Sequence, residues 1–240
     1  MVDLIKILRQ VEKAVLKASK IVLKKDYAVM QKDSQINLVT QVDIDVQNAL
    51  VIALKKILPD AGFIGEENHL EENDKEYCWV IDPIDGTINF ANNLPLWGIQ
   101  VACIKNDEPC AAVILLPEYN ELYYADENGA FLNGEKIHVN NLPANLSLYD
   151  FLGKDSTDCF QKMQRHNPHF RHTYCAAITY SWIACGKLGG ATCIINNPWD
   201  YIPGQYIVKQ AGGYIIDRPN AHTSANSEQL AKLLDSCIID

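Results

Sequence analysis

Apolar residues at helical spacing dominate the start of the chain. A stripe of Leu, Ile and Val with charged residues between them runs through residues 3–25, which predicts an amphipathic N-terminal helix. A second helix is expected from Thr40, whose side chain can cap its start, to about Leu58, because Pro59 follows. The chain therefore opens with two helices.

The pattern then changes to short apolar or alternating runs, which are typical of β-strands. In the first half we expect strands at residues 62–65, 78–82, 98–105, 110–116 and 121–125. Turn signals separate the later runs, and they are Asn106-Asp107, Pro117, Asn128-Gly129 and a strong hairpin signal at Asn133-Gly134. This order predicts an antiparallel meander.

The pattern changes again after about residue 145. We expect, in order, a strand at 147–152, a polar and partly helical segment at 153–172, a helix at 174–186 ended by Gly186, a strand at 190–195, a helix at 199–211 ended by Gly212-Gly213, and strands at 214–216 and 236–239. No internal repeat or low-complexity linker separates the two halves. The sequence therefore predicts one compact body of helices layered on sheets.

Composition limits the choice of partners. The 240 residues are 48% apolar, which is enough for a sizeable core, and they carry a formal net charge of −9. An acidic protein repels nucleic acid and anionic lipid, so we expect neither a nucleic-acid polymer nor a membrane as partner. An anionic substrate would need its charge to be offset locally, and metal ions are the obvious means.

The cysteines and the N-terminus indicate a cellular compartment. Eight cysteines are scattered along the chain without a CxxC pair, which argues against a structural zinc site. The N-terminal segment lacks the features of a signal peptide, and no apolar run approaches the roughly 18 residues of a membrane span. We therefore expect a soluble cytoplasmic protein with reduced thiols.

Four segments end in acidic residues, each at an expected strand end or helix start. They are LVTQVD with Asp43, GEE with Glu66 and Glu67, DPID with Asp82 and Asp85, and NPWD with Asp200. One such acid is usually a cap or a solvated turn residue. If all four segments met in one cleft, the acids would repel one another unless cations were bound. Oxygen ligands without His or Cys suit hard ions such as Mg²⁺.

Gly86 and Thr87 directly follow the last acid of DPID. There we expect the chain to turn into a short helix, whose free backbone N–H groups bind anions such as phosphate. Pro83 stiffens the turn, and Gly86 allows the backbone to approach a ligand closely. Metal-binding carboxylates beside a phosphate cradle are the parts needed for metal-assisted phosphoester hydrolysis.

These strings resemble the inositol monophosphatase family, part of a wider superfamily of lithium-sensitive, magnesium-dependent sugar phosphatases. GEE, DPIDGT and PWD followed by AGG occur in the family's order, and LVTQVD and LNGEKI also match, so the resemblance covers roughly residues 5–240. It implies an α+β fold, a layered αβαβα sandwich of the inositol monophosphatase and fructose-1,6-bisphosphatase type, in a homodimer. It also implies one domain over residues 1–240, with a metal- and phosphate-binding half at 1–145 and a leaving-group half at 146–240.

The resemblance also implies a role for each residue. The implied Mg²⁺ ligands are all oxygen donors, namely Glu66, Glu67, Asp82, the carbonyl of Ile84, Asp85 and Asp200. Two ions share Asp82, and a looser third lies near Glu66 and Glu67. Asp43 and Thr87 would orient and deprotonate the attacking water. Glu66 would be a third catalytic residue as well as a metal ligand. Asp85, Gly86 and Thr87 would contact the phosphate. Because water activated by the metal ions would attack the phosphorus, no covalent nucleophile is needed.

The second half departs from the family pattern. Tyr174, Cys175 and Ala176 replace the usual Gly-Ser/Thr-Ala at a helix start near the substrate. Cys193 replaces a glutamate that binds sugar hydroxyls, and Gly189 replaces an acid. Because a thiol is a weak hydrogen-bond partner, we expect poor activity on inositol monophosphate relative to another phosphoester. Tyr174 would narrow the pocket or stack a base.

The sequence therefore predicts a magnesium-dependent phosphomonoesterase that hydrolyses a small phosphorylated metabolite with metal-activated water. Three alternatives stay open: a non-catalytic metal- or phosphate-binding regulatory homologue, a nucleotide-type phosphatase for NADP or 3′-phosphoadenosine 5′-phosphate, and a purely structural role of the acids. Two side chains keep two interpretations each. Lys32 is either solvated or near the metal loop, and Trp199 either shields the site or belongs to the core.

Overall fold

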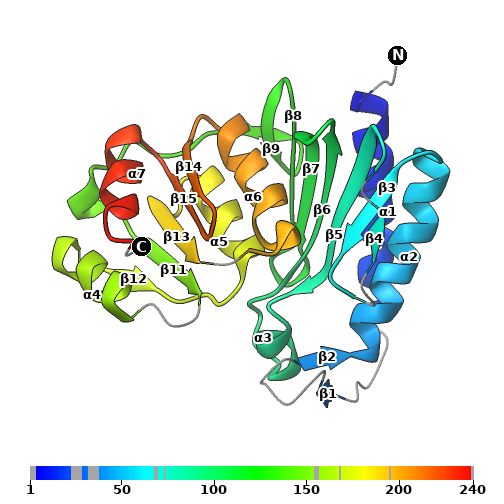
Figure 1. Cartoon of the computed structure of the whole chain (residues 1–240), viewed down its shortest axis with the longest axis horizontal. Helices are drawn as coiled ribbons and strands as arrows, with labels where there is room; N and C mark the ends of the chain where they lie inside the picture. Colours follow the sequence, from blue (N-terminus) through cyan, green and yellow to red (C-terminus); the bar gives the residue numbers. More distant parts are fainter. Residues whose placement is uncertain are drawn as a thin grey trace.

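The first half of the chain forms one large β-sheet (Figure 1). Its eight strands, in the order in which they lie side by side, are β10 (Glu135–Ile137), β9 (Gly129–Leu132), β8 (Glu121–Asp126), β7 (Glu108–Leu116), β6 (Gly98–Lys105), β5 (Tyr77–Asp85), β3 (Gly62–Gly65) and β4 (Glu71–Glu72). Strands β5 to β10 form the predicted antiparallel meander. Its last hairpin turns at Asn133-Gly134, with φ of 50° and 95°, as the sequence predicts.

Helices α1 (Leu4–Val22) and α2 (Gln41–Ile57) cover the outer face of this sheet. Their apolar stripes and the outward side chains of the sheet share one core. Helix α2 starts at Gln41, directly after Thr40, as expected of a helix with Thr40 at its N-cap position. Thr40 also ends strand β2 (Leu38–Thr40), which pairs with β1 (Val29–Gln31). The computed structural model describes residues 4–22, 29–31, 38–67, 70–72, 74–153, 157–167, 169–194 and 196–238.

The second half forms a smaller, five-stranded sheet. Its strands, in spatial order, are β12 (Phe170–Arg171), β11 (Tyr149–Gly153), β13 (Gly190–Ile194), β15 (Ala221–Ala225) and β14 (Tyr214–Arg218). Helices α5 (Ala176–Ala184) and α6 (Pro198–Gln210) lie between the two sheets and pack in a core that both sheets share. Helices α4 (Thr157–His166) and α7 (Glu228–Asp235) pack on its other face. The order of layers is the predicted αβαβα sandwich.

Two expectations for the second half need correction. The strand expected at 236–239 is wrong for its described part, because Ser236 and Cys237 form a turn after α7 and donate to carbonyls of that helix. The helix expected from residue 174 begins only at Ala176, since Tyr174 has a φ of 49°, outside the helical region. Strand β15 and helix α7 are not among the expected elements. No helix in the described ranges is long and apolar enough to cross a membrane.

Strand β5 carries two of the acids to the junction of the two halves. Its side chains alternate between the two cores that flank the large sheet, which explains its nearly continuous apolar run. The pairing of β5 with β6 shifts between Asp82 and Asp85, so the strand bulges at Pro83-Ile84. The chain then turns into the short helix α3 (Thr87–Ala91). The bulge and this turn place both carboxylates next to the segments that precede α5 and α6.

Candidate active site

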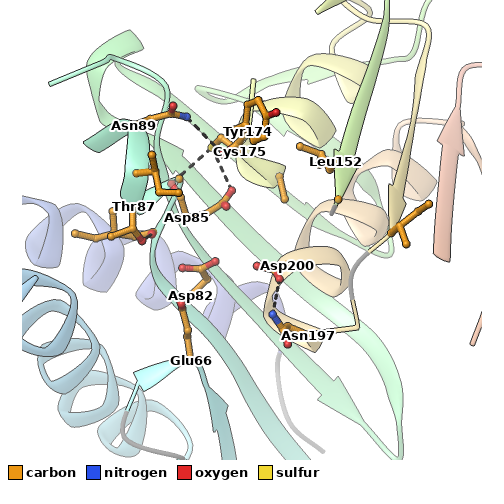
Figure 2. A pocket seen from close by; sticks show the side chains of 16 residues that line it. Glu66, Asp82, Asp85, Thr87, Asn89, Leu152, Tyr174, Cys175, Asn197 and Asp200 are labelled. Atoms are coloured by element: carbon orange, nitrogen blue, oxygen red, sulfur yellow. Dashed lines mark hydrogen bonds between the residues drawn. The ribbon is translucent and has the colours of Figure 1, made fainter. Parts of the chain in front are cut away.

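A cavity of about 570 Å³ lies where the two halves of the chain meet (Figure 2). Strand β5, the turn after it and α3 contribute one side, and residues of β11, α5, β13 and α6 contribute the other. Glu66, Asp82, Asp85 and Asp200 all line this cavity. The structure therefore brings together acids that the sequence places in three separate motifs.

Three of these carboxylates are close enough to hold a metal ion together. One oxygen each of Asp82, Asp85 and Asp200 lies within 4.8 Å of the others. Asp82 is only 1% exposed, and its Oδ1 atom has no hydrogen-bond partner among the described residues. A buried polar atom without a partner is costly, so this oxygen marks a place that suits a cation.

Burial and mutual repulsion raise the pKa values of this cluster. Burial is the largest cause for each group, and it raises the pKa of Asp85 to about 6 and that of Asp200 to about 7. The pKa of Asp82 is raised well above its ordinary value, by burial first and then by the negative charge of Glu66. A bound divalent cation would offset this repulsion. Because every donor is an oxygen, the cluster fits a hard ion such as Mg²⁺.

The other expected metal ligands flank this cluster. Glu66 and Ile84 line the cavity, whereas Glu67 is buried and does not. The side chain of Gln47 fixes the backbone of Glu67, accepting from its N–H at 2.9 Å and donating to its carbonyl at 2.8 Å. The GEE motif is therefore held in place from helix α2.

Asp43 and Thr87, the two residues expected to act on the attacking water, lie side by side. The Thr87 hydroxyl is 3.5 Å from Asp43 Oδ1 and donates to the Ile84 carbonyl at 2.9 Å. Asp43 is buried in the first turn of α2, and Thr87 lines the cavity. The hydroxyl therefore connects the cavity to a buried carboxylate.

Gly86 turns the chain from β5 into α3, and no other residue fits its place. Its φ is 83°, and a Cβ atom there would come within 2.7 Å of the Leu96 carbonyl oxygen. Gly86 and Thr87 both line the cavity beside the acidic cluster. This is the position expected for the phosphate.

The start of α5 contacts the acidic cluster directly. Cys175 Sγ donates to Asp85 Oδ2 at 3.1 Å, and the N–H of Ala177 donates to the same oxygen. Tyr174, Cys175 and Ala176 all line the cavity. Two of the positions at which the chain departs from the family pattern, Tyr174 and Cys175, thus face the same space as the acids.

Position 193 does not face this space. Cys193 is 0% exposed in the core between the sheets, and its neighbour Ile194 lines the cavity instead. Successive residues of a strand point to opposite faces, so a difference of one residue exchanges the core side for the cavity side. Gly189 leaves no room for an acidic side chain, because a Cβ there would collide with Ser147.

Two residues with open interpretations remain. Trp199 packs against the core between the sheets and does not line the cavity, which favours its interpretation as a core residue. Lys32 lies outside the described residues.

Sequence reasoning missed two asparagines that line the cavity. Asn197 donates to Asp200 Oδ2 at 2.9 Å, and Asn89 donates to the carbonyls of Leu96 and Thr173, both at 2.8 Å. Their signal was their position, since Asn89 is two residues beyond DPIDGT and Asn197 directly precedes PWD.

The fold and the site together indicate a metal-binding αβαβα sandwich protein, with the candidate metal site in an acidic cavity between its two halves. The model of the inositol monophosphatase family matches residues 2–232, and the chain belongs to that family. It is 35% identical over 199 residues to "Fructose-1,6-bisphosphatase/inositol-1-monophosphatase" of Thermotoga maritima, a match that covers 80% of this chain and 76% of the relative. It is 33% identical over 199 residues to "Nus factor SuhB" of Xylella fastidiosa, with 79% and 72% covered.

Solved structures confirm the fold. The IMPase of Thermotoga maritima superposes with a TM-score of 0.84 at 28% identity, covering 94% of this chain and 95% of that one. A structure described as an IMPase/NADP phosphatase complexed with NADP and Ca²⁺ has a TM-score of 0.82 at 20% identity, with 95% of each chain covered. At that identity the likeness concerns the fold alone.

Proposed function

We propose that the protein is a magnesium-dependent phosphomonoesterase that hydrolyses a small phosphorylated metabolite in this cavity. The observation that carries the proposal is the Oδ1 atom of Asp82. It is a buried carboxylate oxygen without a partner among the described residues, and it lies beside Asp85, Asp200 and the Gly86 turn. Membership of the inositol monophosphatase family supports the same activity.

The proposed metal ligands are the oxygen donors at the acidic end of the cavity and just behind it. They are Glu66, Glu67, Asp82, the Ile84 carbonyl, Asp85 and Asp200, and Glu66 is also counted as catalytic. When bound, Mg²⁺ lowers the pKa of a water molecule and offsets the charge of the transferring phosphoryl group.

The remaining roles belong to residues of the chain itself. Thr87 orients the attacking water, and its hydroxyl passes a proton toward Asp43, 3.5 Å away. The N–H groups of Gly86 and Thr87 hold the phosphate, with Asp85 beside them. The water oxygen bonds to phosphorus, the ester P–O bond breaks, and the alcohol leaves with a proton. Tyr174, Cys175 and Ala176 face the leaving alcohol, and Cys193 supports that wall from the core.

The proposal also covers the domain organisation, the oligomeric state, the cellular location and the partners of the protein. Residues 1–145 supply most metal and phosphate contacts, and residues 146–240 supply Asp200 and the leaving-group wall of one domain. We expect a homodimer in the cytoplasm, with neither a nucleic-acid polymer nor a membrane as partner. The net charge of −9 supports the last point. Analytical ultracentrifugation tests the dimer.

The test of the activity is phosphate release with Mg²⁺ and with EDTA. The substrates are p-nitrophenyl phosphate, inositol 1-phosphate, fructose 1,6-bisphosphate, NADP and 3′-phosphoadenosine 5′-phosphate. We expect inositol 1-phosphate to be a poor substrate, because the wall facing the alcohol is largely apolar.

Asp82→Asn tests the metal assignment, because it keeps the shape of the side chain but removes its charge. Activity should fall by orders of magnitude with an unchanged circular dichroism spectrum. An active Asp82→Asn variant would refute the metal assignment, and Asp107→Asn, in an exposed turn, is the control.

A regulatory, non-catalytic role is the second candidate. Relatives named Nus factor SuhB, from Xylella fastidiosa and Escherichia coli, are 33% and 31% identical to this chain. A regulatory homologue would still bind Mg²⁺, but it would release phosphate from no substrate of the panel. Calorimetric titration of Mg²⁺ into the wild type and Asp82→Asn, run beside the phosphatase assay, separates the two candidates.

A further inference from the structure

Tyr174 has a backbone conformation that bulky residues rarely adopt. Its φ is 49°, in the left-handed region that disfavours L-residues with a large side chain. Its side chain gains little core packing in return, because Tyr174 is 68% exposed although it lines the cavity. Backbone strain of this kind persists only where the surrounding structure maintains it, and it is concentrated at functional sites.

Hydrogen bonds on both sides of Tyr174 maintain this conformation. The side-chain amide of Asn89 donates to the Thr173 carbonyl at 2.8 Å and to the Tyr174 carbonyl at 3.5 Å. The Thr173 hydroxyl is buried, donates to Asp150 at 2.7 Å and accepts from the Cys175 N–H at 3.2 Å. Residues before and after Tyr174 are therefore fixed, and the position of its Cβ atom with them.

Other rings continue from Tyr174 along the same segment. The ring of His172 lies 5.9 Å from that of Tyr174, at an interplanar angle of 35°, and the ring of Phe160 lies 4.9 Å from His172. The rings of Phe170 and His172 are stacked with their centroids 6.4 Å apart, so Phe170, His172 and Tyr174 form a row. Tyr174 is the member of this row that lines the cavity.

The cavity itself is divided into an acidic end and an apolar end. Its acidic lining residues are Glu66, Asp82, Asp85 and Asp200. Leu152, Ile194 and Ile88 line it as well, and Figure 2 shows Tyr174 and Leu152 away from Glu66. A phosphate at the Gly86 turn would therefore direct its leaving group toward apolar and aromatic side chains. Asn89 lies beside Tyr174 in Figure 2, but its side-chain amide nitrogen already donates to the carbonyls of Leu96 and Thr173. Polyol hydroxyls would therefore find few partners there, and an unpaired polar group costs binding free energy.

We propose that Tyr174 is a specificity-determining residue, and that the preferred leaving alcohol carries a planar ring that stacks on it. This inference rests on the proposed phosphatase function and narrows its substrate class to phosphomonoesters of alcohols that carry an aryl or heteroaryl ring. The shared chemistry is a flat, polarisable face, which either a phenyl ring or a nucleobase supplies. The reaction is unchanged: water supplies the oxygen for phosphate, and the ring-bearing alcohol leaves with a proton.

Two matched substrate pairs test the ring preference. Benzyl phosphate and cyclohexylmethyl phosphate have similar leaving alcohols and sizes, but only the first has a flat ring. Adenosine 5′-monophosphate and ribose 5-phosphate both release a ribose 5-hydroxyl, but only the first carries a base. We expect kcat/KM to favour the ring-bearing member of at least one pair by about tenfold, within the range of a single base–aromatic stacking contact. The pair that responds identifies the source of the ring.

Variants of Tyr174 test whether this residue causes the preference. Tyr174→Gly removes the ring and adopts a positive φ without strain, so the fold should be kept. It should bring the ratio within each pair close to one, mainly by raising KM for the ring-bearing substrate. Tyr174→Phe should retain the preference, because it keeps the ring. Tyr214→Ala, which removes an exposed tyrosine from strand β14, should change nothing.

A binding measurement keeps the two proposals apart. Benzylphosphonate and cyclohexylmethylphosphonate cannot be hydrolysed, and calorimetry with Mg²⁺ present compares their affinities in the wild type and in Tyr174→Gly. A ring preference that Tyr174→Gly abolishes supports the inference even if no substrate releases phosphate, an outcome that counts only against the proposed function. Phosphate release without a ring preference, or a preference that survives Tyr174→Gly, overturns the inference and leaves the proposed function standing.

Discussion

The thiol of Cys175 donates a hydrogen bond to the carboxylate of Asp85 across 3.1 Å. Cys175 precedes helix α5 and Asp85 ends strand β5, so this bond joins the two sides of the cavity. The N–H of Ala177 donates to the same oxygen, which fixes the orientation of a proposed metal ligand from the second half of the chain. Burial raises the pKa of the Cys175 thiol well above its ordinary value, and this keeps it protonated as a donor.

Removal of this thiol should weaken catalysis without abolishing it. A hydrogen bond to a charged group contributes about 1.5–3 kcal/mol, and a thiol is a weak donor, so the lower end applies. We expect kcat/KM of Cys175→Ala for p-nitrophenyl phosphate to fall about tenfold. Cys175→Ser supplies a stronger donor and should restore activity. Cys159→Ala removes a buried thiol of helix α4, away from the cavity, and is the control. Wild-type activity in Cys175→Ala would show that Asp85 does not need this donor.

The acidic end of the site was predictable because its residues belong to short, ordered strings. GEE, DPIDGT and PWD each carry their acids at the end of an element, and the fold brings those ends together. The apolar pattern also predicted β5 and the meander after it. A strand buried on both faces leaves a continuous apolar run, which is a strong signal.

The remaining parts depend on contacts that the local sequence does not show. Strand β15, with the sequence AHTSA, has few strong strand formers, and pairing with β13 and β14 on both sides determines its structure. The left-handed backbone of Tyr174 contradicts its local preference, and bonds from distant Asn89 maintain it. The one-residue offset that buries Cys193 and exposes Ile194 to the cavity follows from sheet register. Helix α7 did have a signal, since Ser227 caps its start.

Asp43 and Thr87 should act as one unit on the attacking water. Their side-chain oxygens are 3.5 Å apart, and Thr87 is the member that reaches the cavity. Residues that act as a unit give non-additive losses when they are removed together. Thr87→Ala, Asp43→Asn and the double variant should therefore lose similar amounts of kcat. Losses that multiply in the double variant would mean that the two side chains act independently.

The stability of the metal-free protein should fall as pH rises from about 4 to 7. The folded-state pKa values of Asp85 and Asp200, about 6 and about 7, exceed the ordinary value of 3.8, mainly because of burial. The folded state therefore binds these protons more tightly than the unfolded state does. The free energy of unfolding thus falls as pH rises from the ordinary pKa of 3.8 to the folded-state pKa values. Thermal unfolding in EDTA at pH 5 and pH 8 measures this, and Mg²⁺ should remove most of the difference. If Tm of the metal-free protein rises over this range, then other groups outweigh the cluster.

Asp150 should position the cavity wall although it does not touch the cavity. It is 0% exposed in strand β11, and it accepts hydrogen bonds from the Thr173 hydroxyl at 2.7 Å and the Thr179 hydroxyl at 2.5 Å. Both hydroxyls also lie 3.0 Å from the carbonyl of Cys175, so the carboxylate fixes the segment that supplies donors to Asp85.

Asp150→Asn keeps the volume of the side chain but replaces an acceptor by a donor. We expect the free energy of unfolding to fall by about 1–3 kcal/mol, which lowers Tm by several degrees. Activity should fall with it at temperatures where the variant is fully folded, because the donors to Asp85 lose their fixed position. Asp107→Asn, on the surface, should change neither quantity. A double-mutant cycle with Thr179→Val provides the decisive measurement, since groups in one network show a coupling energy of about 0.5 kcal/mol or more. Additive losses in denaturant unfolding would show that Asp150 and Thr179 stabilise the protein separately.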